Sequence, residues 1–69
     1  MDDYKVRIRE LREDRGLTQK QVAQVLSTTQ QVYSRYEMGK NEMPIRHLLV
    51  LCNYYQVSAD YLLGRTSSK

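Results

Sequence analysis

The sequence predicts a small all-α domain of five short helices, and three observations support this prediction. A chain of 69 residues can bury only a modest core, which favours short and closely packed helices. Apolar residues recur at intervals of three and four along most of the chain, which is the spacing of one helical face. The β-branched residues are scattered at helical spacing, and the sequence contains no Asn-Gly or Asp-Gly pair that would close a hairpin.

Periodicity and capping residues together set the expected helix bounds. The predicted helices span residues 4–15, 19–26, 29–38, 45–56 and 59–64. Their expected inward-facing residues are Tyr4, Ile8, Leu11, Val22, Val25, Leu26, Tyr33, Tyr36, Leu48, Leu49, Cys52, Tyr55, Tyr61 and Leu62. The expected start and stop residues are Thr18, Thr29, Pro44 and Ser58 before helices, and Gly16, Gly39 and Gly64 after them.

The composition is that of an ordinary folded protein, because 41% of the residues are hydrophobic and 28% are charged. We expect one domain at residues 1–64, followed by a short frayed tail at residues 65–69. The first residues are charged, unlike a signal peptide, and no apolar run reaches the ~20 residues of a membrane span. These features predict a cytoplasmic protein without membrane contact.

A metal centre or a catalytic centre is not expected. The single cysteine, Cys52, and the single histidine, His47, are too few for an internal disulfide or for a metal site of their own. The sequence offers no catalytic triad, no glycine-rich phosphate loop and no paired inward carboxylates, so we expect no enzyme, cofactor or small-molecule ligand. The net charge of 11 − 8 = +3 fits a polyanionic partner, but it also fits an ordinary solvated surface.

The second and third predicted helices are short and joined by about three residues, which is the local pattern of a helix-turn-helix. The matching elements in and around this pattern are Leu11-Arg12, Gly16-Leu17-Thr18-Gln19, Ala23, Ser34-x-Tyr36-Glu37-x-Gly39, Pro44 and Val57-Ser58-x-Asp60-Tyr61-Leu62-Leu63-Gly64. Over residues 8–64 the chain resembles the XRE family of bacterial and phage repressors, which includes the lambdoid phage repressor and Cro proteins. The resemblance implies a compact, lambda repressor-like domain whose third helix enters the major groove of double-stranded DNA, usually within a symmetric homodimer.

The third helix is predicted to carry the residues that read DNA bases. If Tyr33 and Tyr36 face inward, a step of about 100° per residue turns the polar residues of this segment outward. Glutamine can donate to and accept from adenine, and arginine can donate twice to guanine. The expected base-reading residues are Gln30, Gln31, Ser34 and Arg35. The resemblance implies base contacts for the two glutamines and the arginine.

A second set of residues is expected to contact DNA phosphates. Gln19 begins the second helix, where unpaired backbone N–H groups and the positive end of the helix dipole favour an anion. Thr18 and Thr29 are expected to cap their helices and to contact phosphate from the same region. Lys40 can reach phosphate just beyond the third helix.

The resemblance also implies a largely buried ion pair between Arg12 and Glu37, which would join the first helix to the end of the third. Two positions depart from the family pattern. Ser27 stands where many relatives carry a glycine in the left-handed conformation. Tyr33 replaces a small aliphatic residue, and its hydroxyl leaves two orientations open, toward the core or toward DNA.

Taken together, these patterns predict a sequence-specific transcriptional regulator, most simply a repressor that binds a near-palindromic operator as a dimer. The alternative is an antitoxin-type or partner-binding module of the same fold, in which DNA binding is secondary. Tyr54, Tyr55 and residues 57–63 offer apolar side chains for a dimer interface, although the same residues could simply complete the core, which is the expected place of Tyr55, Tyr61 and Leu62.

Overall fold

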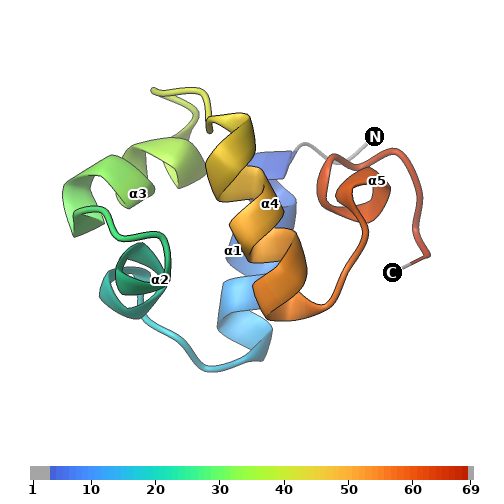
Figure 1. Ribbon diagram of the computed structural model, residues 1–69, viewed down its shortest axis with the longest axis horizontal. Coiled ribbons are helices and arrows are strands. Elements are labelled where there is room, and N and C mark those ends of the chain that lie inside the picture. Colours follow the sequence, from blue (N-terminus) through green and yellow to red (C-terminus); the bar gives the residue numbers. More distant parts are fainter. Residues whose placement is uncertain (1–3, 69) are drawn as a thin grey trace.

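A computed structural model describes residues 4–68, and every regular element within that range is a helix (Figure 1). The helices are α1 (Tyr4–Asp14), α2 (Gln19–Val25), α3 (Gln30–Met38), α4 (Ile45–Tyr55) and α5 (Ala59–Leu62). The predicted all-α fold of five helices is therefore confirmed, with helix ends that differ by one or two residues. In Figure 1, α2 and α3 lie at one end of the molecule and α5 at the other, while α4 crosses the middle. None of the described helices is long and apolar enough to cross a membrane.

Polar side chains begin three of the helices, as the sequence predicts. The Thr18 hydroxyl accepts a hydrogen bond from the Gln21 N–H, and the Gln21 side chain accepts one from the Thr18 N–H, which completes a capping box. Thr29 and Ser58 each accept from the backbone N–H three residues later. Pro44 precedes α4 in an extended conformation, with φ −65° and ψ 152°.

All five helices end on the same pattern, in which a residue with left-handed backbone follows and the next N–H bonds to the carbonyl five residues earlier. The left-handed residues are Gly16, Ser27, Gly39, Gln56 and Gly64. Ser27 has φ 57° and Gln56 has φ 59°, a region that costs a residue with a side chain about 1–2 kcal/mol. Of the two outcomes open at Ser27, a strained left-handed residue or a replaced geometry, the structure shows the left-handed residue, whereas Gln56 carries no glycine-like signal in the sequence.

The inward faces of the five helices form one core. Its buried apolar residues are Ile8, Leu11, Val22, Ala23, Leu26, Tyr33, Tyr36, Met43, Leu51, Cys52, Tyr55 and Leu62. Tyr33 is fully buried and packs edge-on against Tyr36, with ring centroids 6.3 Å apart, so of its two open orientations the structure shows the one toward the core. α3 packs against both α1 and α2, and α5 packs against α1 and α4.

The predicted inward stripe of α4 is wrong at Leu49, which is 52% exposed. The buried face of α4 instead follows His47, Leu51 and Tyr55 at intervals of four. Leu49 lies about 160° around the helix from Leu51, because two steps of about 100° carry it past the opposite side. His47 is buried beside Tyr36, whose hydroxyl lies 3.0 Å from His47 Nδ1 in a hydrogen bond. Residues predicted to face inward that are only half-buried are Tyr4, Val25, Leu48 and Tyr61.

Candidate nucleic-acid interface

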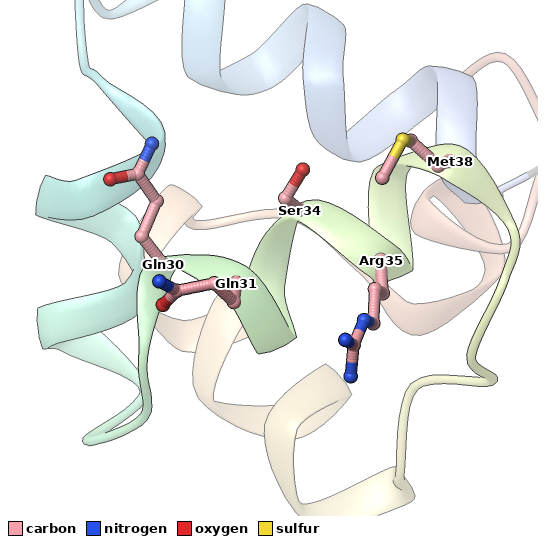
Figure 2. Close-up of a pocket in the computed structure, with 5 residues that line it drawn as sticks. All are labelled: Gln30, Gln31, Ser34, Arg35 and Met38. Carbon is pink, nitrogen blue, oxygen red and sulfur yellow. The ribbon is translucent and has the colours of Figure 1, made fainter.

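The outward face of α3 carries the four residues predicted to read bases. Gln30, Gln31 and Arg35 are exposed, and Ser34 is half-buried. Together with Met38 they line a surface hollow of about 340 Å³ (Figure 2). Within residues 4–68, none of the four polar side chains forms a hydrogen bond or an ion pair with the rest of the fold. Their hydrogen-bonding groups are therefore available to a partner.

A second hollow, of about 360 Å³, adjoins the first because Gln30 and Gln31 line both. It extends the surface toward α2 and the turn between the two helices, where Lys20, Gln24 and Thr28 are among its lining residues. The lysine contributes positive charge here. The candidate interface is thus a polar and basic surface that runs from α2 across the start of α3.

The residues predicted to contact phosphate flank this surface, and they differ in exposure and in hydrogen bonding. Thr29 caps α3 by accepting from a backbone N–H, so its own hydroxyl hydrogen can still be donated. Thr18 is bonded to its capping-box partner, and Lys40 is exposed. Gln19 is half-buried, and its amide donates to Glu37 Oε1 at 3.1 Å. A phosphate at the start of α2 would therefore meet the free backbone N–H groups of its first turn.

Arg12 and Glu37 lie on the inner side of α3, away from the candidate interface, and form a two-armed ion pair. Arg12 Nε is 2.8 Å from Glu37 Oε2, and Arg12 Nη2 is 3.2 Å from Glu37 Oε1. The exposed fractions of the two side chains are 14% and 4%. Arg12 Nη1 also donates to the carbonyl of Leu17 at 3.0 Å. With the Gln19 amide, the Glu37 carboxylate joins α1, α2 and α3 at one point.

The electrostatics of this cluster keep Glu37 charged. Burial raises the pKa of the Glu37 carboxyl, but hydrogen bonds led by that of Arg12 outweigh burial and hold its pKa below the ordinary value. The same hydrogen bond raises the pKa of Arg12. Burial raises the pKa of Tyr33, whose hydroxyl makes no hydrogen bond of good geometry among the described residues. The inner side of α3 is thus held to α1 by an ion pair in which both side chains are charged.

Sequence reasoning missed Met38 as a member of the interface. Met38 follows Gln31 by seven residues and Ser34 by four, so it lies on the same helical face, and its spacing alone could have identified it. It is 56% exposed and is the one apolar residue that lines this hollow.

Known proteins with similar sequences and structures are helix-turn-helix proteins. The helix-turn-helix family model matches residues 8–62 of this chain. YobD of Bacillus subtilis (strain 168), an uncharacterized HTH-type transcriptional regulator, is 36% identical over 63 residues, which cover 91% of this chain and 56% of YobD. ImmR of the same organism, an HTH-type transcriptional regulator, is 41% identical over 59 residues, which cover 86% of this chain and 46% of ImmR. The chain therefore spans about half the length of these curated relatives.

Among solved structures, the P22 c2 repressor protein in complex with synthetic operator 9T superimposes with a TM-score of 0.85. It is 26% identical, and the match covers 96% of this chain and 100% of that chain. The family model covers more than half of the sequence, and the fold agrees along nearly its whole length. The chain belongs to the helix-turn-helix family, in the XRE group that its sequence resembles.

Proposed function

We propose that this chain is the DNA-binding part of a transcriptional repressor that recognises a specific sequence of double-stranded DNA. The observation that carries the proposal is the outward face of α3, whose polar side chains have no partner within the described fold. The regulator names of YobD and ImmR, and the operator bound to the P22 c2 repressor, support the same function.

In this proposal α3 lies in the major groove. Residues of α3 contact base edges, and residues at the starts of α2 and α3 and just beyond α3 contact phosphates. Each glutamine amide can donate an N–H to adenine N7 and accept from the adenine N6 amino group through its oxygen, and the Arg35 guanidinium can donate twice to guanine. The residues proposed to read bases are Gln30, Gln31, Ser34 and Arg35. The residues proposed to hold phosphates are Thr18, Gln19, Thr29 and Lys40. The ion pair of Arg12 with Glu37 keeps α3 in position from behind.

The proposal includes binding as a homodimer, for which the dimensions of the domain provide support. Half-sites on one face of DNA lie one helical turn apart, about 34 Å. The domain measures 29 × 22 × 20 Å, so two copies on adjacent major grooves lie almost in contact. The apolar groove beside the turn after α3, lined among others by Ile45, Leu49 and Leu63, offers exposed apolar surface for a second copy.

The experiment that tests this function is selection from a random duplex library at several salt concentrations. We expect an enriched near-palindromic sequence, with a salt slope that reports the number of phosphate contacts. Enrichment of no sequence would overturn the repressor proposal and favour the partner-binding alternative.

Two matched variants then sort the contacts within the selected site. Arg35→Ala should lower discrimination at particular base pairs by about 1–3 kcal/mol, because it removes a two-armed contact to one base. Lys40→Ala should weaken all sequences alike and reduce the salt slope by about 1, because it removes one phosphate contact. Both residues are exposed, so neither change should unfold the domain.

A further inference from the structure

The first turn of α1 packs against the turn that joins α3 to α4. The Tyr4 hydroxyl accepts a hydrogen bond from the Met43 N–H at 3.1 Å, which ties the two segments together. The next residue, Lys5, crosses the backbone at the end of α3, because a Cβ added to Gly39 would lie 2.7 Å from Lys5 Cδ and 2.9 Å from Lys5 Nζ. A lysine of the first helix therefore places its ammonium group at the end of the third.

The surface between these segments is hollowed and carries more positive than negative charge. The hollow has a volume of about 270 Å³, and the residues that line it are Tyr4, Lys5, Gly39, Asn41 and Glu42. Glu42 is the one acidic residue among them. The exposed Lys40 follows Gly39 directly and adds a second lysine to the same turn.

The backbone of this turn is largely used within the fold. The N–H of Gly39 donates to the Tyr36 carbonyl at 3.2 Å, and the N–H groups of Lys40 and Asn41 donate to the Arg35 carbonyl at 3.0 and 3.3 Å. The Met43 N–H is bonded to Tyr4. An anion that reaches this turn would therefore depend chiefly on side-chain cations.

The expected path of DNA brings a phosphate to this end of α3. In a helix-turn-helix, the N-terminal residues of the recognition helix contact the base edges, and Gln30 and Gln31 hold that place here. α3 has 9 residues, so its axis is about 13.5 Å long, whereas the major groove is about 12 Å wide. With its first residues at the bases, α3 should end at the rim of the groove, where the phosphate backbone runs.

We propose that Lys5 contacts a DNA phosphate at the end of α3, in addition to the phosphate contact proposed for Lys40. This inference rests on the proposed DNA-binding function and extends its contact surface to α1. A lysine ammonium acts as a point charge with three donors, so it can hold a phosphate without any requirement on the base sequence. The same cation also lies near the negative end of the α3 dipole, so the test must separate DNA contact from a role in the fold alone.

The test compares Lys5→Gln with the unmodified protein on the selected duplex, because glutamine removes the charge and keeps much of the side-chain length. The slope of log affinity against log salt should fall by about 1 per bound subunit. Affinity should drop about eightfold at about 0.1 M salt and match that of the unmodified protein near 1 M. Lys5→Arg should restore the slope, because it restores the charge.

Arg65→Gln is the matched control. It removes an exposed cation beside α5, which lies at the other end of the molecule from α2 and α3 (Figure 1). The salt slope of this variant should equal that of the unmodified protein. A double variant of Lys5→Gln with Lys40→Ala should lose about 2 from the slope, because the two lysines make separate contacts.

The outcomes separate this inference from the function on which it rests. A Lys5→Gln protein with a lower melting temperature and an unchanged salt slope would assign Lys5 to the fold alone and overturn the contact. Loss of discrimination at a particular base pair would also overturn it, because a phosphate contact carries no sequence information. In both cases the DNA-binding function stands. If the unmodified protein binds no duplex, the function fails and the Lys5 contact fails with it.

Discussion

Replacement of Arg12 by alanine is expected to destabilise the domain more than any single change on the candidate interface of α2 and α3. The substitution removes both hydrogen bonds of Arg12 to Glu37 and its bond to the Leu17 carbonyl. It leaves a carboxylate that is only 4% exposed, with the Gln19 amide as its remaining donor in the hydrogen-bonded cluster. An unpaired charge at such a site lacks both hydration and a counter-ion, so the folded state loses free energy that the unfolded state does not.

The magnitude follows from the burial of the pair. Breaking a buried pair costs about 3–5 kcal/mol, and the 14% exposure of Arg12 places this one near the lower end, at about 3 kcal/mol. For a domain of this size each kcal/mol shifts the melting temperature by about 4–8 °C. The Tm of Arg12→Ala should therefore fall by roughly 12–24 °C at neutral pH.

The pH dependence of the loss identifies its cause. In the native protein the pKa of Glu37 is lowered below 4.5, so its contribution to stability is full above pH 4.5 and is lost as pH falls through the folded pKa. Without Arg12, burial dominates and raises the pKa of Glu37, so protonation on acidification relieves the variant. The gap in unfolding free energy between the two proteins should be widest near neutral pH and narrow toward pH 4.

Calorimetry and urea unfolding of both proteins between pH 4 and pH 7 measure this gap. Glu37→Gln is the matched control, because it keeps the shape of the side chain and leaves Arg12 bonded to Leu17. It should cost less, about 2 kcal/mol, because it leaves no buried carboxylate without a counter-ion, and the unfolding free energy of this variant should lack the pH dependence that Glu37 contributes. An Arg12→Ala protein with an unchanged midpoint, or with a gap that is constant with pH, would refute the reasoning.

Three further outcomes are expected. Ser27→Gly should stabilise the domain by about 1 kcal/mol in urea unfolding, because glycine adopts the φ of 57° without strain; a loss of stability would contradict this reading. Burial, followed by the charge of Arg46, lowers the pKa of His47 below 6.5, so stability should be full above pH 6.5 and decline as pH falls through the folded pKa. Proton NMR of this single histidine reports that pKa directly, and a value at or above 6.5 would show that the ring is solvated. Leu49→Glu should abolish cooperative binding to the full DNA site while single half-sites bind normally; Val50→Glu, outside the apolar groove, should leave both unchanged.

Local sequence signals predicted most of the fold. The residues whose burial was predicted wrongly or not predicted have physical causes in common. Caps such as Thr18 and Thr29 act within one helical turn, so a sequence displays them directly. The burial of His47 depends on a hydrogen bond to Tyr36, eleven residues away, which no periodic pattern contains. Leu49 was placed inward because it is apolar, yet the neighbouring helices leave that side of α4 uncovered. Such errors arise where tertiary packing, and not local preference, decides burial.

The candidate site was predictable to a similar extent. The residues proposed to read bases all fall on one face because helical geometry requires it, and the structure brings them together around one hollow. The orientation of the Gln19 amide toward Glu37 was not predictable, because it depends on the distance between α2 and α3. Met38 was not predicted because it is apolar, although its spacing from Gln31 and Ser34 already placed it on the same helical face.

The two faces of α3 also bear on how such a domain changes over generations. The largest buried side chains that hold the helix in place lie on its inner side and include Tyr33, Tyr36 and Glu37. The outer residues support no tertiary hydrogen bond among the described part of the chain, so exchanging them should cost the fold little. If these residues read DNA as proposed, new sequence preferences can arise by single substitutions without first restoring stability, which leaves such a domain open to rapid divergence in its target sites.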